Sequence, residues 1–313
     1  MSFPPTFVRC LFPQAIGLFA AVILCACDHG EKAAPSPSAS ASSTPGGIDP
    51  ALLAKSLNPK GLAPYSGPTG NVKGIVRVNG DPPPDADLQA DFTPKCESAR
   101  AVHAKQFRVA EGGGLVDALV AVTGYEGYLP EKQQKVEVIG KGCSWGTQTI
   151  AMTFGQQLEI KSGDDFSYIP ELRPNRMGVV FVAPPHREGV LLTPEHPRSY
   201  KLVDTSHPFS TAAVFVLQYP THDVTDERGA FEIKGIPVGK VKINALLPPT
   251  MESVGKDIEI KAGETLQVEL VIQHRAAAPA PSTSTAPSTS TAPSTSTAPS
   301  TSTAPSAAPS ATK

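Results

Sequence analysis

Short apolar runs separated by glycine, proline, asparagine and aspartate turns dominate the middle of the chain, from residue 72 to residue 272. Residues 72–78 alternate apolar and polar side chains, which is typical of a strand with one buried face. Residues 115–123 are almost all apolar, which indicates a strand covered on both faces. Further strands are expected at 135–139, 149–154, 157–160, 178–183, 199–203, 212–217, 229–233, 241–245, 256–260 and 265–272. Because no segment carries the apolar period of a helix over ten or more residues, the pattern predicts an all-β sandwich or barrel.

The two ends of the chain have a composition that is unsuited to forming a core. Residues 31–50 are mostly proline, alanine, serine and threonine, and the hexamer STSTAP is repeated four times from Ser282 to Pro305. Both segments have too few large apolar side chains to offset the loss of chain entropy on ordering. We therefore expect a disordered tether over 27–64 and a disordered Ser/Thr/Pro/Ala repeat tail over 275–313.

The N-terminal segment has the pattern of an export signal. One arginine, Arg9, precedes an apolar run over 15–26, which has the length of a signal-peptide core and is too short to span a bilayer as a helix. The sequence LCAC at 24–27 resembles the lipobox of bacterial lipoproteins. This resemblance implies that residues 1–26 are removed and that Cys27 carries the lipids that anchor the protein in a membrane. The alternatives are an ordinary secretory signal and an uncleaved anchor.

The five cysteines divide between the export signal and the mature protein. Cys10 and Cys25 leave with the signal and Cys27 is the expected lipid site, so Cys96 and Cys143 remain. An even number of cysteines in an oxidising compartment most often forms disulfides, and we expect Cys96 and Cys143 to be bonded. The expected location is lipid-anchored in the cell envelope, at the periplasmic face of a membrane or at the outer membrane or cell surface.

Charge and motifs exclude several classes of function. The formal net charge is −2, with 27 basic and 29 acidic residues, and no basic stripe occurs, so nucleic acid is not an expected partner. The sequence has no G-x-S-x-G elbow, phosphate-binding loop or dinucleotide fingerprint, so we predict no enzymatic activity. Tyr125 and Tyr128 stand beside glycines between strands. Two interpretations of these tyrosines stay open: a sugar or peptide site, or a cap on the sandwich.

Several motifs follow one another in a recognisable order. They are GNVKGIVRVNGDPPP at 70–84, Cys96, GGGL at 112–115, KGCSW at 141–145, TFGQQLEI at 153–160 and SHPF at 206–209. This order resembles a family of exported cupredoxin-like proteins with plastocyanin-type cores. The stretch VTDERGAFEIKGIPVG at 224–239 resembles the hairpin of carboxypeptidase-regulatory-like β-sandwiches. The resemblance implies a cupredoxin-like Greek-key β-sandwich over 65–222 and a smaller transthyretin-like or Ig-like β-sandwich over 223–274, with which strand 71–79 can pair.

The same resemblance indicates where the ligands of a type I copper site would lie. Such a site uses two histidines, a cysteine thiolate and usually a weak axial methionine. This chain has Tyr168 and His207 at the histidine positions, Asp204 at the cysteine position and Ser210 at the methionine position. His207 is the only retained ligand, so we expect no metal and no cofactor.

These observations predict a non-enzymatic lipoprotein of the cell envelope, whose head is a binding or scaffolding module on a cupredoxin scaffold that has lost its copper site. Its expected partners are the membrane, through the lipid anchor, and an unidentified protein or glycan ligand. The alternative is a copper-binding or electron-transfer protein of the periplasm with unusual ligands.

Overall fold

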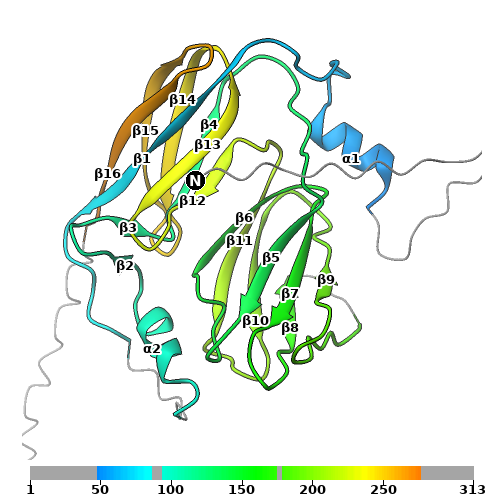
Figure 1. Cartoon of the computed structure of the whole chain (residues 1–313), viewed down its shortest axis with the longest axis vertical. Helices are drawn as coiled ribbons and strands as arrows, with labels where there is room; N and C mark the ends of the chain where they lie inside the picture. The colour runs from blue at the N-terminus through cyan, green and yellow to red at the C-terminus, as the bar shows by residue number, and fades with distance from the viewer. Residues whose placement is uncertain (1–47, 87–93, 175–177, 276–313) are drawn as a thin grey trace, which may run out of the picture. The chain divides into compact units, whose positions relative to one another are not determined.

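The computed structural model describes residues 48–86, 94–174 and 178–275, which all belong to one compact unit. The all-β prediction is confirmed, since strands dominate these ranges and the helices in them are short (Figure 1). The elements are α1 (Pro50–Leu57), β1 (Thr69–Asn79), α2 (Glu97–His103), β2 (Arg108–Val109), β3 (Leu115–Val116), β4 (Leu119–Thr123), β5 (Lys135–Gly140), β6 (Thr149–Thr153), β7 (Gln157–Ser162), β8 (Pro170–Arg173), β9 (Val190–Leu192), β10 (Ser199–Asp204), β11 (Thr211–Leu217), β12 (His222–Val224), β13 (Ala230–Pro237), β14 (Gly239–Leu247), β15 (Glu252–Ile260) and β16 (Thr265–Gln273). The expected signal 1–26, its neighbour Cys27 and the repeats of the tail lie outside the described residues.

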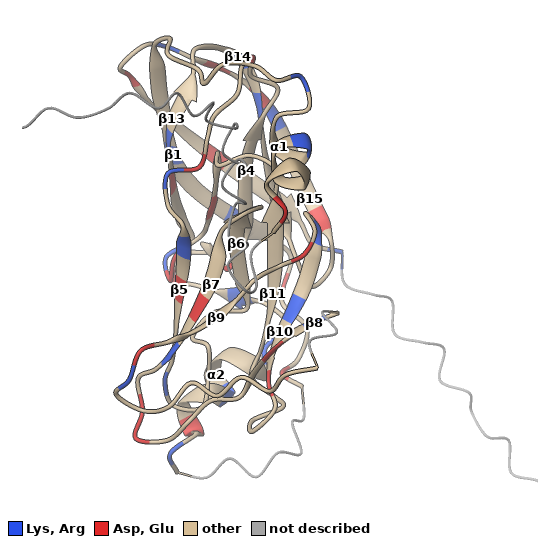
Figure 2. Cartoon of the chain, turned by 90° about the vertical axis from the view of Figure 1, so that its right-hand side faces the viewer, with Lys and Arg blue, Asp and Glu red and all other residues tan. Residues whose placement is uncertain are grey.

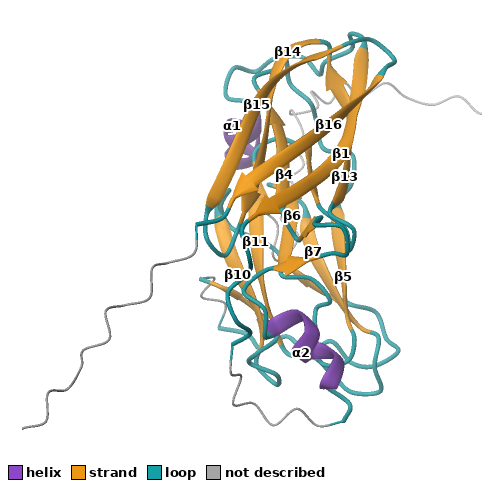
Figure 3. Cartoon of the chain, turned by 90° about the vertical axis from the view of Figure 1, so that its left-hand side faces the viewer, coloured by secondary structure: helices purple, strands orange, loops and turns teal. Residues whose placement is uncertain are grey.

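Two sheets enclose the first hydrophobic core. One has the strand order β13-β1-β16 and the other has the order β12-β4-β14-β15. Figure 3 labels all of these strands except β12. β1 runs antiparallel to β13 and parallel to β16, so that Val72 lies opposite Ile233 on one side and Leu266 on the other. The largest fully buried side chains of this core are Phe107, Leu115, Ile236, Ile243 and Leu247. Removal of these apolar side chains from water is the main source of stability of the sandwich.

The first core is assembled from separate parts of the chain. β1 belongs to it, as expected for strand 71–79, but β4 belongs to it as well. The expected boundary between residues 222 and 223 therefore does not separate the two cores. The stretch 224–239 also differs from a simple hairpin, because the strands β12 and β13 that it connects belong to different sheets.

The second hydrophobic core lies between a sheet of order β6-β11-β10-β8 and a sheet of order β5-β7-β9. β6 pairs with β11 in parallel, and β5 pairs with β7 in parallel, whereas the remaining pairs in these sheets are antiparallel. The largest fully buried side chains of this core are Met152, Phe154, Leu158, Ile160, Tyr168, Leu192 and Leu202. β10 ends at Asp204, so the loop from 205 to 210 leaves the end of this sandwich.

A helix lies inside the segment that was expected to be a disordered tether. α1 begins after Asp49, whose carboxylate accepts a hydrogen bond of 2.8 Å from the N–H of Ala51. The apolar side chains of this segment that pack against the second core are Ile48, Leu53 and Leu57. The structure therefore differs from the expected tether 27–64 over residues 48–64, because a few apolar side chains find a partner surface that composition does not reveal.

The strand expected at 178–183 does not form. Val179 and Val180 are 65% and 75% exposed, and only Ala183 makes a bridge, to Tyr168. Two prolines follow directly and supply no N–H for a ladder. Apart from the bridge at Ala183, residues 178–183 pair with no strand in the described part of the chain.

The surface carries both signs of charge. Basic and acidic residues are interspersed over strands and loops in Figure 2, without a region of one sign. Over residues 48–86, 94–174 and 178–275, no helix is long and apolar enough to cross a membrane.

Candidate functional site

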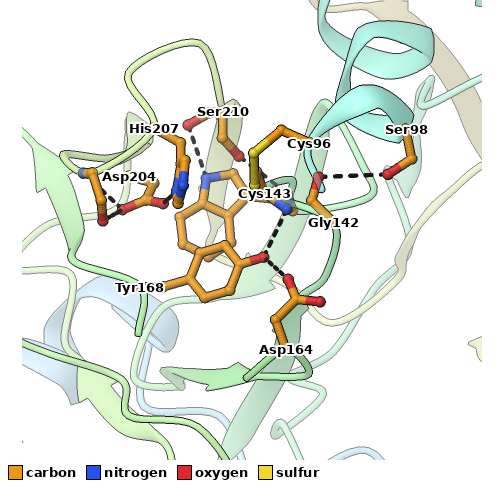
Figure 4. The surroundings of a disulfide bond; sticks show 11 residues. Cys96, Ser98, Gly142, Cys143, Asp164, Tyr168, Asp204, His207 and Ser210 are labelled. Atoms are coloured by element: carbon orange, nitrogen blue, oxygen red, sulfur yellow. Dashed lines mark hydrogen bonds and ion pairs between the residues drawn. A yellow bond between two sulfur atoms is a disulfide. The ribbon is translucent and has the colours of Figure 1, made fainter. Parts of the chain in front are cut away.

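The loop after β10 brings three of the four expected copper positions together. Backbone hydrogen bonds close this loop tightly: the N–H of His207 donates to the carbonyl of Asp204 (3.2 Å), the N–H of Ser210 donates to the carbonyl of His207 (2.8 Å), and the N–H of Asp204 donates to the carbonyl of Ser210 (3.1 Å). The side chains of Asp204, His207 and Ser210 therefore converge at one end of the second sandwich (Figure 4).

Asp204 is the centre of this arrangement. Its side chain is completely buried, and its Oδ1 accepts hydrogen bonds from the N–H of Ile169 (3.0 Å) and from both the N–H (3.1 Å) and the hydroxyl (2.7 Å) of Ser206. Its Oδ2 lies 2.6 Å from Nδ1 of His207. The carboxylate thus holds the Nδ1 edge of the imidazole, and the His207 side chain is 20% exposed.

Tyr168, at the remaining copper position, is fully buried beside His207. Its hydroxyl donates to Oδ2 of Asp164 (2.6 Å) and accepts from the N–H of Cys143 (3.0 Å). Burial, assisted by the hydrogen bond to Asp164, raises the pKa of Tyr168 well above its usual value near 10, so the phenol stays neutral. Its ring centroid lies 5.9 Å from that of His207.

Ser210 accepts hydrogen bonds from Trp145, the only tryptophan of the chain. The N–H of Trp145 donates to the hydroxyl of Ser210 (3.2 Å), and the indole N–H donates to the Ser210 carbonyl (3.1 Å). The indole is 3% exposed and its centroid lies 5.3 Å from the ring of Tyr168. Trp145 is therefore part of the packed core, with both of its N–H groups satisfied.

The predicted disulfide is confirmed, with 5.0 Å between the Cα atoms of Cys96 and Cys143. Cys96 directly precedes α2, and Cys143 lies in the turn after β5. The structure also places the disulfide against His207: both Sγ atoms and a ring nitrogen of His207 lie within 4.8 Å of one another. Sequence analysis missed this contact, because neither cysteine stands at a ligand position and no spacing connects them to His207.

The geometry decides what this site can do as it stands. The residues at all four expected copper positions lie close together, but the polar side-chain atoms of Tyr168, Asp204 and Ser210 are hydrogen-bonded to other groups of the protein. Cys96 and Cys143 are bonded to each other. No thiolate is present among the described residues of the oxidised protein. A type I copper centre, which depends on a cysteine thiolate, does not fit these side chains.

A hollow lies beside Tyr125 and Tyr128, the two tyrosines for which the sequence allowed two interpretations. It has a volume of about 710 Å³, and three tyrosines, Tyr65, Tyr125 and Tyr128, line it. The N–H of Tyr65 donates to the carbonyl of Tyr128 (2.8 Å), which ties the two sides of the wall together. Gly127 approaches the Tyr65 ring so closely that a Cβ at this position would lie 2.9 Å from a ring atom. Polar groups on the same wall come from Asn58, Glu126 and Gln218.

Two further histidines are half-buried and have lowered pKa values. Nε2 of His222 lies 3.2 Å from the hydroxyl of Thr153, which donates to Glu131 (2.7 Å). Burial lowers the pKa of His222 to about 4, against the opposing effect of Glu131. Burial, with a contribution from the nearby Arg108, also lowers the pKa of His103 to about 4. These groups contribute to the pH dependence of stability.

No protein-family model matches the chain, and no curated protein matches it. Among solved structures, a reduced amicyanin variant is similar over 26% of this chain and 80% of its own, with 15% identity and a TM-score of 0.23. A Cu(I) amicyanin variant is similar over 28% of this chain and 85% of its own, with 17% identity and a TM-score of 0.23. The copper-containing nitrite reductase NirK from Thermus scotoductus SA-01 is similar over 31% of this chain and 25% of its own, with 20% identity and a TM-score of 0.23. Similarity at this level carries no information about activity.

Proposed function

We propose that this protein is a non-enzymatic lipoprotein of the cell envelope, whose head is a binding or scaffolding module built on a cupredoxin-type β-sandwich without its copper site. The proposal rests on the state of the ligand positions. Tyr168, Asp204 and Ser210 are hydrogen-bonded within the protein and none of them is a soft ligand. The smaller sandwich is proposed to be carboxypeptidase-regulatory-like, on the strength of the sequence at 224–239.

Copper loading of the oxidised protein tests the loss of the copper site. Purified protein is mixed with Cu(II), and its visible spectrum is compared with that of His207→Ala. A thiolate–copper centre gives an intense charge-transfer band at about 600 nm. We expect no such band in either protein. A strong band that disappears in His207→Ala would overturn the proposal and favour electron transfer.

For the ligand of the head we propose a glycan, bound in the hollow lined by Tyr65, Tyr125 and Tyr128. Tyrosine offers a flat apolar face for the C–H groups of a sugar ring and a hydroxyl for its oxygens. Amide and carboxylate groups beside aromatic rings supply the few oriented polar contacts that a binding site needs. The backbone hydrogen bond between Tyr65 and Tyr128 holds these two residues of the hollow in place before a ligand binds.

Titration with a soluble oligosaccharide tests the glycan proposal. A tetramer of β-1,4-linked N-acetylglucosamine is added in a calorimeter to wild type, Tyr128→Ala and Met251→Ala. Met251 is 63% exposed and lies outside the hollow, so its variant is the matched control. We expect measurable binding in wild type and in the control, and a loss of about tenfold or more in Tyr128→Ala. Equal binding in all three proteins would exclude this hollow.

The lipid anchor is tested separately at Cys27. Cells that express the full chain or Cys27→Ala are grown with a labelled fatty acid and then fractionated. We expect label and membrane association in wild type and neither in the variant, because durable anchoring needs acyl chains. A variant that is labelled and membrane-bound to the same extent as wild type would contradict the anchor.

A further inference from the structure

Three metal-binding donors meet where the disulfide contacts the loop after β10. We propose that reduction of the Cys96–Cys143 disulfide turns this place into a binding site for monovalent copper, formed by the two cysteine sulfurs and the imidazole of His207. The inference goes beyond the proposed function, which concerns the oxidised protein. Neither cysteine stands at a copper position of the cupredoxin resemblance, where Asp204 replaces the thiolate.

The distances between the three donors are already close to those that a common metal ion requires. Both Sγ atoms and a ring nitrogen of His207 lie within 4.8 Å of one another. Metal–sulfur bonds of about 2.3 Å and metal–nitrogen bonds of about 2.0 Å allow two ligands of one ion to lie at most about 4.6 Å apart. Small side-chain movements after reduction are therefore enough, because the two backbones are already held with their Cα atoms 5.0 Å apart.

Asp204 orients the imidazole for this role. Nδ1 of His207 lies 2.6 Å from its Oδ2, which leaves Nε2 as the ring nitrogen for a metal. The carboxylate is itself held by the N–H groups of Ile169 and Ser206, so it does not follow the ring. A carboxylate that accepts the second N–H of a ligating histidine is the usual support of protein metal sites. Asp204 is thus a positioning residue.

The donor set selects the metal. Two thiolates and one imidazole favour soft or borderline ions, which among biological metals means Cu(I) and Zn(II). Structural zinc sites are closed by four protein ligands, whereas the described residues supply three here. Cu(I) is stable with three ligands, and it is the oxidation state of copper that persists under the conditions that reduce a disulfide.

Aromatic side chains surround the ligands. The ring centroids of Phe166, Tyr168 and Phe209 lie 5.4, 5.9 and 6.0 Å from that of His207. Cys96 and Cys143 are 6% and 1% exposed. A shielded site of this kind slows the reoxidation of thiolates and of bound Cu(I), because oxidants reach them with difficulty.

The reduction step needs a dithiol, for which we name an exported thiol–disulfide oxidoreductase. One of its thiolates attacks the more exposed Cys96 sulfur and forms a mixed disulfide, and the Cys143 sulfur leaves. The second thiolate of the reductant then attacks the reductant sulfur that is bonded to Cys96. The reductant forms its own disulfide and Cys96 leaves as a thiolate. Two electrons and two protons reach the cysteines, and the reductant becomes a disulfide. Binding of Cu(I) afterwards releases the two thiol protons.

A competition titration tests the proposal on the full chain in which Cys10, Cys25 and Cys27 are replaced by serine, so that Cys96 and Cys143 carry the only thiols. The protein is reduced with a phosphine under nitrogen, the phosphine is removed, and Cu(I) is added with a coloured chelator. We expect one Cu(I) per reduced chain and none per oxidised chain. The double variant Cys96→Ser, Cys143→Ser is expected to bind none. X-ray absorption at the copper edge should show two sulfur ligands and one nitrogen ligand.

Matched histidine variants separate ligation from folding. His207→Gln should weaken Cu(I) binding at least tenfold and remove the nitrogen ligand from the absorption spectrum, and Asp204→Asn should weaken binding by about 10–100-fold. His186→Gln, at a histidine that is 72% exposed, should change nothing. Circular dichroism of each reduced protein checks that the fold persists.

Several results would overturn the proposal. The first is a reduced wild type that competes with the chelator for Cu(I) no better than the double serine variant does, and the second is a His207→Gln protein that binds Cu(I) as tightly as wild type. The third is a preference for Zn(II) over Cu(I). The fourth is a disulfide that is reduced only when the protein unfolds. None of these results bears on the test with Cu(II), which uses the oxidised protein.

Discussion

At the scale of single residues, Asp204 has a structural role. The chain around it supplies several hydrogen-bond donors to a carboxylate that is completely shielded from water. Buried charge is costly unless it is fully paired, so the donors and the carboxylate depend on each other.

We expect Asp204→Ala to lower the free energy of unfolding by about 3 kcal/mol, because it removes a completely buried carboxylate together with its hydrogen bonds to Ile169, Ser206 and His207. Urea unfolding followed by circular dichroism measures the effect. Asp165→Ala is the control: Asp165 is 94% exposed at the side chain and pairs only with the exposed His186, so its loss should change stability by less than about 0.5 kcal/mol. Equal effects would mean that the network around Asp204 contributes little.

His222 makes stability depend on pH. Its pKa is about 4 in the folded protein and about 6.5 in the unfolded chain, so the unfolded chain binds a proton first as the pH falls. The free energy of unfolding should therefore decrease between pH 6.5 and pH 4, by up to about 3 kcal/mol for this residue. Urea unfolding at several pH values should show a shallower decrease for His222→Gln than for wild type. Parallel curves would show that the pKa of His222 is the same in the folded protein and in the unfolded chain.

At the scale of elements, the disulfide attaches α2 to the second sandwich. Cys96 directly precedes this seven-residue helix, and none of its residues except Ala99 is fully buried. A helix of this length is not stable alone, so its position depends on attachments at its ends. Besides the disulfide, Nε2 of His103 lies 2.9 Å from the Ser144 hydroxyl.

Replacing both cysteines by serine should lower the free energy of unfolding by about 3–4 kcal/mol, because the bond closes a long loop in the unfolded chain. The two cysteines are 47 residues apart in sequence. Thermal unfolding of the variant and of wild type measures the difference, and hydrogen exchange should show earlier exchange of the α2 amides. A variant as stable as wild type would show that the loop is held by other contacts.

At the scale of the whole described unit, a buried ion pair connects the two cores. The guanidinium of Arg108 in β2 donates to Asp117 at 2.7 Å and to Glu227 at 2.9 Å. The hydroxyl of Thr147, which precedes β6 of the second sandwich, lies 2.5 Å from the other oxygen of Asp117. Asp117 adjoins β4 of the first sandwich, so its carboxylate is bonded to groups beside both cores.

The two carboxylates that pair with Arg108 should differ in how much they contribute to stability. Asp117→Asn removes a buried charge and should cost about 3 kcal/mol, whereas Glu227→Gln, at a side chain that is 72% exposed, should cost less than about 1 kcal/mol. Trp145 fluorescence reports the second core and circular dichroism reports both. We expect the two signals to coincide during unfolding of wild type and to separate in Asp117→Asn. Coinciding signals in this variant would show that the cores are coupled elsewhere.

The sequence by itself determined the features that neighbouring residues encode. Alternating apolar positions predicted most strands, including β1, because a strand exposes every second side chain to the same face. Counting the cysteines that remain after export predicted the bond between Cys96 and Cys143. The residue types at 168, 204 and 210 also predicted that these positions lack the ligands of a type I copper site, a prediction that the Cu(II) titration tests.

Only the tertiary structure decided which distant segments meet. The docking of α1 on the second core, the place of β4 in the first core and the exposure of Val179 and Val180 all depend on which surfaces meet, and no local pattern contains that information. The contact of the disulfide with His207 has the same origin. It exists because the turn after β5 and the loop after β10 lie at the same end of the second sandwich. Their position follows from the pairing of strands that are far apart in the sequence.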